Sequence, residues 1–587
     1  MIRKWGFYIL LVILAVVIYF NPNVKTISAG VAILLFGMVM LEEGFRVFTK
    51  GPLQNILKKA TDKLYKSITA GALVTALIQS SSLVSVITIS FISAGLISLA
   101  GGIGLIFGAN IGTTATAWLV AGFGLKIKIS ALAMPMLIFG LVFSFQKKES
   151  LKGIGNVLAG LGFFFLGIYY MKEGFDVFKQ YIDLTEYAMT GMAGVLVYCG
   201  LGIVITTVLQ SSSATLALIL TALSAGQIEY ENALALAIGA NIGTTITAVL
   251  GSISSNIAGK RLAGAHFIFN VTTGLITLIF IFPLANLVNL LSDAFGISET
   301  DYTLKLALFH SIFNVLGVLI MLPFIKKLEV FLIKVLKEKN IKKDIDEPKY
   351  LFDSVLEFPG STITALLNES KYLYKNAIFE IIAHGLNIHR HDIKSDSKIK
   401  KIVKRSRQDM QTDVEQLYYS KVKTIYGEII RFATTAQSKF KLNPNQSKTI
   451  TEIKIANRKM VEILKDVREL NKNVTKALNS DNTHVSKEYD KLRKKVTKVL
   501  RVIYLFRTED ESEKYAQKLI ELKEEAQENM RQSNTSIDEL IRKNLINSEM
   551  ASSLFNDYSN VNDMIKKLIQ VAELLYGKKD LILEEAE

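Results

Sequence analysis

Two clusters of amide and hydroxyl side chains interrupt otherwise apolar sequence, and each cluster is a copy of the other. Residues 71–117 recur, without a gap, as residues 202–248. Polar groups at membrane depth must be satisfied by protein, water or a ligand. A duplicated polar set therefore predicts a binding site built from two halves. The recurring motifs are Gln79–Ser82 with Gln210–Ser213, and Gly108–Thr114 with Gly239–Thr245.

The first pair of motifs has the chemistry of an anion site. Neither copy contains Arg or Lys, so an anion would be held by amides, hydroxyls and helix N-terminal N–H groups. The summed dipole of such a helix end is equivalent to roughly half a positive charge. The predicted anion-binding residues are Gln79, Ser80, Ser81, Ser82, Gln210, Ser211, Ser212 and Ser213.

The second pair of motifs could bind a coupling cation. Unwound backbone carbonyls coordinate Na⁺, and sodium would supply the countercharge that the protein lacks. An anion moving alone against a membrane potential costs about 2.3 kcal/mol per charge per 100 mV, which cotransported cations offset. The predicted sodium-binding residues and site backbone are Asn110, Thr113, Thr114, Asn241, Thr244 and Thr245.

The chain around these motifs consists of two parts that differ in composition. Of residues 1–325, 32 are charged, against 89 of residues 326–587, and 34 of the 38 glycines precede position 326. This split predicts a membrane domain followed by a soluble helical domain. The net charge of +15 is attributed to cytoplasmic loops, so no nucleic-acid partner is expected. The single cysteine, Cys199, excludes a disulfide framework.

The hydropathy pattern predicts a multi-pass topology with both termini in the cytoplasm. Residues 5–20 are interpreted as an uncleaved anchor, and residues 67–123 as a helical hairpin that dips into the bilayer before a helix interrupted near Asn110. Sequences of the type Glu-Gly-Phe-x-Val-Phe at 43–48 and 173–178 fall on opposite sides, so the repeats are inverted. Basic loops support this count. The other expected crossings are residues 28–48, 129–145, 154–170, 263–283 and 304–324.

A smaller echo lies in the last two crossings: His266 and Asn270 recur as His310 and Asn314. Residues four apart share a helix face. Hydrogen bonding between helices is favoured over a ligand or proton role. A serine hydrolase is disfavoured because hydrolysis needs a base beside the nucleophile, and neither serine tract has a nearby His or Lys in sequence. Only a fold that brings one of these histidines to a tract serine would favour it.

At these motifs, residues 25–325 resemble the sodium-dependent phosphate cotransporter family, and residues 350–587 resemble, more loosely, the PhoU-type domain of bacterial members. The resemblance implies Na⁺-coupled transport of inorganic phosphate. It also suggests acidic pairs for a metal in the second domain, although a solvated helix face is the favoured interpretation. These metal candidates are Asp409, Asp413, Glu462 and Asp466.

The expected fold is all-α: a polytopic membrane domain of two inverted repeats with re-entrant hairpins, plus a soluble cytoplasmic helical bundle. The expected divisions are a membrane domain at 1–325, with repeats at about 28–145 and 154–283 and a final span at 304–324, a linker at 326–349, and a PhoU-like domain at 350–587. In the bundle, residues 442–447 and 480–483 are expected to be loops.

The expected function is a sodium/phosphate symporter in a bacterial inner membrane, with alternating access between the repeats and a regulatory C-terminal domain. A phosphate exporter and a phosphate sensor that does not transport remain open alternatives. An enzyme and an organic cofactor are not expected. The expected partners are phosphate, Na⁺ and the lipid bilayer, with a cytoplasmic regulatory partner or self-association through the bundle.

Overall fold

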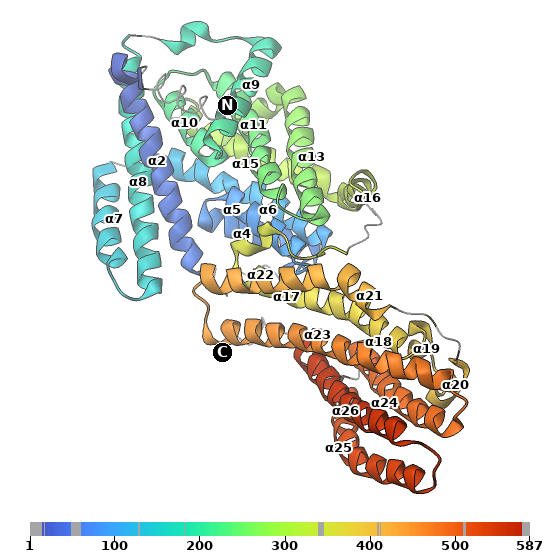
Figure 1. Ribbon diagram of the computed structural model, residues 1–587. Helices are drawn as coiled ribbons and strands as arrows, with labels where there is room; N and C mark the ends of the chain where they lie inside the picture. Colours follow the sequence, from blue (N-terminus) through green and yellow to red (C-terminus); the bar gives the residue numbers. More distant parts are fainter. Residues whose placement is uncertain are drawn as a thin grey trace. The chain divides into compact units, whose positions relative to one another are not determined.

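The computed structural model describes residues 15–16, 18–48, 60–126, 129–181, 183–338, 346–407, 410, 413–508 and 512–577. Every regular element in these ranges is a helix, so the all-α prediction is confirmed (Figure 1). The chain forms two compact units, Met1–Glu338 with Phe352–Phe358, and Lys339–Leu351 with Pro359–Glu587. Most of the predicted anchor at 5–20 lies outside the described residues.

The helices of the first unit follow the predicted duplication. The first repeat comprises α2 Pro22–Phe48, α4 Leu64–Ile78, α5 Ser81–Ser93, α6 Leu99–Trp118, the π-helix η2 Leu119–Gly124 and α7 Ile129–Ser144. The second comprises α8 Glu149–Phe178, η3 Leu184–Tyr187, α9 Gly191–Leu209, α10 Ser212–Ser224, α11 Tyr230–Gly243, α12 Thr245–Ser252 and α13 Ile257–Ile279. The unit continues with α14 Ile281–Ala294, α15 Tyr302–Met321, η4 Leu322–Phe324, α16 Ile325–Val335 and η5 Asp353–Glu357.

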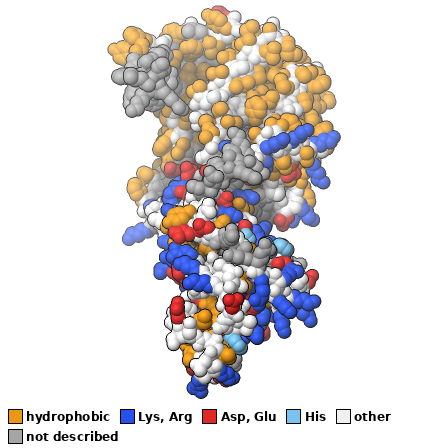
Figure 2. All heavy atoms as spheres, turned by 45° about the vertical axis from the view of Figure 1, so that its right-hand side comes forward, with side chains coloured by type: hydrophobic (Ala, Val, Ile, Leu, Met, Phe, Trp, Pro, Cys, Tyr) orange, Lys and Arg blue, Asp and Glu red, His pale blue; other side chains and the backbone are white. Residues whose placement is uncertain are grey.

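Helices of this unit have the length and composition of membrane spans. Seven within the described residues are long and apolar enough to cross a bilayer, among them Val24–Phe45 and Gly191–Leu209. Large apolar side chains such as Leu73 and Leu196 are exposed, as expected for a surface that faces lipid. Figure 2 shows hydrophobic side chains over this unit and charged ones over the other.

Each repeat contains a re-entrant hairpin. Gly108 of α6 lies against Ile68 of α4, and Gly112 lies against Ala72, so α4 and α6 run parallel. The intervening α5 must therefore return toward the side from which α4 entered. The hairpin tip is at residues 79–80, between α4 and α5.

The second repeat has the same construction. Gly239 of α11 lies against Cys199 of α9, and Gly243 lies against Ile203, so these helices are also parallel, and the hairpin tip is at residues 210–211. The predicted interruption near Asn110 is wrong for the first copy, because α6 is continuous through it. In the second copy a single residue, Thr244, separates α11 from α12, and its dihedral angles are still those of a right-handed helix.

Helices α2 and α8, which open the two repeats, pack as an antiparallel pair through glycines spaced seven apart. Gly30 lies against Met171, Gly37 against Phe164, and Gly44 against Val157. Residue numbers rise on one helix as they fall on the other. The two copies therefore run in opposite directions, as inverted repeats must.

Replacing Gly37 by alanine should destabilise the membrane unit. A Cβ there would lie 2.5 Å from the backbone nitrogen of Phe164, and backbone cannot move aside as a flexible side chain can. Overpacking of this kind costs roughly 1–3 kcal/mol. The thermal unfolding temperature of the detergent-purified protein should fall. A Cβ added at Gly200, in α9, would meet no atom within 4 Å, so G200A should melt like wild type; equal melting of both variants would contradict the packing.

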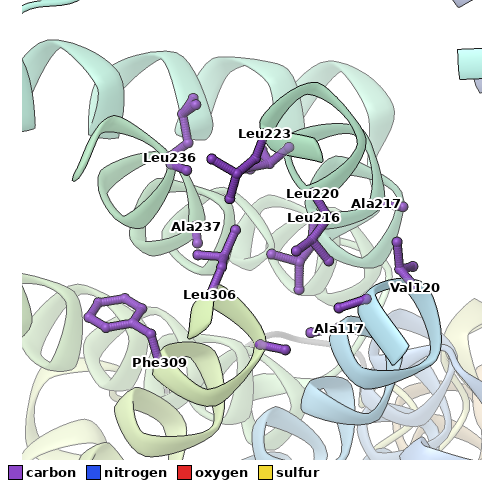
Figure 3. Close-up of a cluster of buried hydrophobic side chains, with 14 of the residues drawn as sticks. Ala117, Val120, Leu216, Ala217, Leu220, Leu223, Leu236, Ala237, Leu306 and Phe309 are labelled. Carbon is purple, nitrogen blue, oxygen red and sulfur yellow. The ribbon is translucent and has the colours of Figure 1, made fainter. Parts of the chain in front are cut away.

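The core of the second repeat forms around α10. In Figure 3, Leu216, Leu220 and Leu223 of α10 project toward α6, α11 and α15. Partner side chains include Ala117 and Leu306, both fully buried. The re-entrant helix is thus held by elements of both repeats and by the helix after them. This packing fixes the position of the serine tract at its N-terminal end.

The second unit is a helical bundle, as predicted. Its long helices have strongly amphipathic sequences and bury apolar stripes such as Ile453, Met460 and Val467 of α23. It comprises α17 Pro359–Leu373, the π-helix η6 Tyr374–Ile378, α18 Phe379–Gly385, α19 Arg390–Lys394, α20 Ile399–Arg405, α21 Val414–Lys421, α22 Lys423–Lys439, α23 Pro444–Leu478, α24 Thr483–Thr508, α25 Ser512–Arg542 and α26 Ser548–Tyr576.

Several predicted boundaries are corrected. The expected crossing at 263–283 begins earlier, because Asn256 caps α13 through the backbone N–H groups of Ala258 and Gly259. Helix α14 was not predicted, and α16 lies at the start of the segment 326–349, whose assignment as a linker stays a prediction. The expected loop at 442–447 ends early, because Asn443 and Gln446 form a capping box at the start of α23. The loop expected at 480–483 is confirmed up to position 482.

Candidate functional site

The hairpin tips are formed by the first two residues of each Gln-Ser-Ser-Ser motif. Gln79 has φ 60° and ψ 23°, and Gln210 has φ 53° and ψ 23°. This left-handed conformation is unfavourable for a residue with a Cβ and costs about 1–3 kcal/mol. Both repeats adopt this conformation at matched positions. The strained backbone is therefore a shared feature of the two hairpin tips and not an accident of one repeat.

The two tips meet at one cavity of about 330 Å³. All eight predicted anion-binding residues line it, so the structure brings together the two motifs that the sequence separates by 131 positions. The lining residues are Leu35, Met38, Val39, Glu42, Gln79, Ser80, Ser81, Ser82, Leu209, Gln210, Ser211, Ser212 and Ser213.

Two helix N-termini point into this cavity. Ser80 caps α5 by accepting a hydrogen bond from Leu83 N at 3.2 Å, and Ser211 caps α10 by accepting one from Ala214 N at 3.1 Å. The next two residues of each helix have backbone N–H groups without an intrahelical partner. These N–H groups and the dipoles behind them favour an anion.

A reciprocal pair of contacts joins the repeats beside the cavity. The hydroxyl oxygens of Thr116, in α6, and Ser213, in the second tract, lie within hydrogen-bond distance, 3.2 Å apart. The repeat counterpart of Thr116, Thr247 of α12, accepts from Ser82 of the first tract at 3.5 Å. The third serine of each motif thus contacts a threonine of the opposite repeat, which indicates a local two-fold arrangement.

The glutamines do not share this symmetry. Gln79 Nε2 donates to Ala76 O, and Gln79 Oε1 accepts from Thr116 at 2.7 Å. The side chain of Gln210 is exposed. The glutamine of the first half is therefore hydrogen-bonded within its own repeat, while that of the second half is exposed.

The six residues predicted to bind sodium do not line the cavity. The Thr113 and Thr244 hydroxyls donate to carbonyls one turn earlier in their own helices, at 2.9 and 3.0 Å. Thr114 and Thr245 do the same at 2.7 and 2.8 Å. Asn110 donates to Ile106 O. A role for them in sodium binding stays a prediction.

The two His and Asn pairs differ in their contacts. Asn241 donates to Asn314 Oδ1 at 2.8 Å and lies 3.2 Å from His310 Nε2, so hydrogen bonding between helices is confirmed for this half. Asn270 donates to His266 O within its own helix, and among the described residues no such contact between helices is found for this pair. In the described part of the chain, neither imidazole hydrogen-bonds a tract serine.

The acidic residues suggested for a metal are engaged otherwise. Asp413 caps α21, Glu462 pairs with Arg458 at 3.0 Å, and Asp466 pairs with Lys567 at 2.7 Å. Asp409 lies outside the described residues. Among the residues described, no group of three or more His, Cys, Asp or Glu side chains could hold a metal ion.

Three site residues are not among those predicted from the sequence. Thr116 and Thr247 are also polar residues that recur at matched positions in the two repeats. The duplication that identifies the serines could therefore have identified these threonines as well. Glu42 lines the cavity from α2 but lies outside the duplicated stretch. It lies within the crossing predicted at 28–48, and α2 ends at Phe48 as that prediction has it.

Two inverted repeats, each with a broken re-entrant hairpin, and a shared polar cavity at their tips define a multi-pass membrane transporter. The chain belongs to the Na⁺/Pi-cotransporter family, whose model matches residues 33–173 and 184–298. That match stops before the helical bundle, whose resemblance to PhoU stays a prediction. No solved structure matches the chain.

Known relatives agree with this assignment. The Bacillus subtilis protein named "Uncharacterized protein YqeW" is 31% identical over 50% of this chain and 92% of its own length. The Escherichia coli protein named "Putative inorganic phosphate export protein YjbB" is 28% identical over 61% of this chain and 64% of its own. The mouse "Sodium-dependent phosphate transport protein 2C" is 36% identical over 118 residues, 19% of each chain.

Proposed function

We propose that this protein carries inorganic phosphate across the membrane by using the energy of a sodium gradient. The observation that carries the proposal is the cavity at which both serine tracts and two helix N-termini converge. It offers hydroxyls, amides and N–H donors, and no Lys or Arg is among its described lining residues. A tetrahedral oxyanion matches this set of donors. Family membership supports phosphate as that anion.

Sodium fits the C-terminal helix end that precedes each hairpin tip. Helix α4 ends at Ile78 and α5 begins at Ser81, so a C-terminal end and an N-terminal end meet at one tip. The carbonyls of the first favour a cation and the N–H groups of the second favour an anion. Each break can therefore hold both ions close together, and binding of one favours binding of the other.

Alternating access follows from the inverted repeats. The present conformation ties Gln79 to Thr116 and leaves Gln210 exposed. In the opposite conformation Gln210 would be hydrogen-bonded within its repeat and Gln79 would be exposed, so that the site opens to the other side of the membrane. The basic segments containing Lys147, Lys260 and Lys326 favour a topology with both termini in the cytoplasm of a bacterial cell.

Export is the second candidate for direction. It is favoured by the printed name of the YjbB relatives, which refers to phosphate export. The chain covers 59–64% of their length, so their activity as whole proteins is carried over here only as a proposal. The same cavity serves either direction, because a secondary transporter follows the gradients across it.

A regulatory role for the bundle has structural support in η5. This short segment packs on α5. In addition, Ser354 N donates to Ser254 O, in the turn between α12 and α13, at 3.4 Å, and Val355 is fully buried. The next element is α17, the first helix of the second unit. Through this connection, a regulatory partner or self-association of the bundle would act on the helix that carries the first serine tract.

Reconstituted protein should take up labelled phosphate when sodium is imposed as an inward gradient, and not when choline replaces it. Reversing the sodium gradient in preloaded vesicles should drive phosphate out. Comparing the two rates, with the orientation of the inserted protein determined by protease accessibility, would identify the preferred direction. Saturable phosphate binding without flux under any gradient would instead favour a sensor, and uptake indifferent to sodium would exclude coupling.

A further inference from the structure

Helix α16 follows α15, the last long apolar helix of the first unit, and does not continue its course. Helix α15 has 20 residues, about 30 Å at 1.5 Å per residue, which is enough to cross the hydrocarbon core of a bilayer. The short segment η4, which contains Pro323, then separates it from α16. Figure 1 shows α16 at the edge of the first unit beside α13, turned away from the axis of that helix. Three lysines and a glutamate among the 11 residues of α16 place it outside the hydrocarbon core.

One face of α16 packs on α6 and α13. Ile325, Leu328 and Leu332 are buried on this face. Arg261 of α13 caps the end of the helix, because its Nε and Nη2 both donate to Leu336 O, at 3.0 and 2.8 Å. Helix α16 is therefore held in a defined position on α13.

The opposite face of α16 is basic. A helix turns by about 100° per residue, which places four exposed lysines on the side away from the buried residues. Figure 2 shows Lys and Arg side chains at one margin of the hydrophobic surface of this unit. Within the described residues none of the four forms an ion pair, and Lys327 Nζ lies 5.5 Å from the centre of the Phe324 ring. These lysines are Lys326, Lys327, Lys334 and Lys337.

Apolar side chains are exposed beside the lysines. Phe331 and Val335 are 52% and 59% exposed, and they share one edge of α16 because they are four residues apart. Ile320 of α15 and Phe324 of η4 are exposed as well, so exposed apolar side chains continue along the chain from α15 onto α16. A basic face beside exposed apolar side chains is typical of a helix that lies in the interface of a membrane.

We propose that α16 lies in the membrane interface and binds the headgroups of anionic phospholipids through its lysines. Phe331 and Val335 enter the boundary of the acyl chains, while the lysine stems extend along it and hold their ammonium groups at the lipid phosphates. The opposite charges of the lysines and these headgroups select anionic lipid over zwitterionic lipid. Each lysine close to an anionic surface strengthens binding by roughly fivefold.

The depth of Phe331 tests the placement of α16. Phe331→Cys, made in a Cys199→Ala background so that it is the only thiol, is labelled with a nitroxide and reconstituted in vesicles of phosphatidylcholine and phosphatidylglycerol. Oxygen, which concentrates among acyl chains, should relax this label more strongly than a water-soluble nickel chelate does. Stronger relaxation by the chelate would place α16 in water. Protection from both agents would place it under protein, such as the second unit, and either result would overturn the proposal.

The lipid preference is tested by titrating the full-length protein in detergent with fluorescent phosphatidylglycerol or with phosphatidylcholine that carries the same fluorophore. Wild type should prefer phosphatidylglycerol by roughly 25-fold, the value for two lysines at fivefold each. The preference should fall to about twofold or less once all four charges are removed. An unchanged melting temperature in detergent shows that this variant is folded. The variant combines Lys326→Gln, Lys327→Gln, Lys334→Gln and Lys337→Gln.

A matched control removes four exposed lysines from the second unit, in and just before α20. It has the same net charge as the α16 variant and should keep the wild-type preference. Loss of the preference in both variants would show that only net charge matters, and its retention in the α16 variant would show that the lipid binds elsewhere. Both results would overturn the proposal, and neither depends on phosphate transport. The control combines Lys398→Gln, Lys400→Gln, Lys401→Gln and Lys404→Gln.

Discussion

Replacing Gln79 by alanine should abolish sodium-driven phosphate uptake. The amide of Gln79 lies at the tip of the first hairpin, in contact with Thr116, and lines the cavity. A hydrogen bond to a charged group contributes about 1.5–3 kcal/mol, so phosphate affinity should fall roughly 10- to 150-fold. Uptake should then be undetectable when it is measured in proteoliposomes at phosphate concentrations below the Kd of the wild-type protein.

Further substitutions at Gln79 separate its amide from its backbone conformation. Glycine adopts positive φ without strain, and asparagine tolerates it better than most residues. Gln79→Gly should therefore lose uptake, because the amide is gone although the strain is relieved. Gln79→Asn should retain part of it. Gln146, whose exposed side chain donates to Val142 O, provides a control, and Q146A should transport normally. Full activity in Gln79→Gly would show that only the backbone shape matters.

A disulfide between the repeats should stop transport reversibly. Thr116 and Ser213 hydroxyls are 3.2 Å apart, close enough for cysteines at these positions to approach disulfide geometry. In a Cys199→Ala background, which removes the only native thiol, Thr116→Cys with Ser213→Cys should cross-link under oxidation. Uptake should fall to background and recover with a reductant, because alternating access requires the repeats to move past each other.

The local two-fold arrangement supplies a second, independent pair. Ser82→Cys with Thr247→Cys, whose hydroxyls are 3.5 Å apart, should behave in the same way. Single-cysteine variants serve as controls and should show no response to oxidant. Failure of both pairs to cross-link would contradict the adjacency of the tracts. Cross-linking without loss of uptake would show that they stay together throughout the cycle.

The sequence is most informative where polar residues are duplicated. Gln79–Ser82 and Gln210–Ser213 can be assigned to one site because nothing but a shared function requires the same polar motif twice in apolar sequence. The hairpins are also predictable, from apolar stretches too long for one helix. The glycine spacing on α2 and α8 gains its meaning only from the structure, in which it accounts for their antiparallel packing.

Other features depend on tertiary structure. A helix break at Gln79 could not be predicted, because glutamine is not a residue that favours positive φ; Asn110 is the more natural candidate, yet α6 continues through it. The presence of Glu42 in the cavity lining depends on where α2 passes the hairpin tips, which no local pattern encodes. The threonines predicted for sodium hydrogen-bond their own helices, a use that spacing cannot distinguish from ligand binding.

The number of phosphate sites per chain tests the central claim most directly. Equilibrium binding of labelled phosphate to the purified protein in sodium should saturate at one phosphate per chain. Ser80→Ala with Ser81→Ala in the first tract, or Ser211→Ala with Ser212→Ala in the second, should each remove nearly all of this binding, since both tracts line one cavity. Saturation at two phosphates per chain, with half the capacity surviving when either tract is altered, would contradict a single shared site.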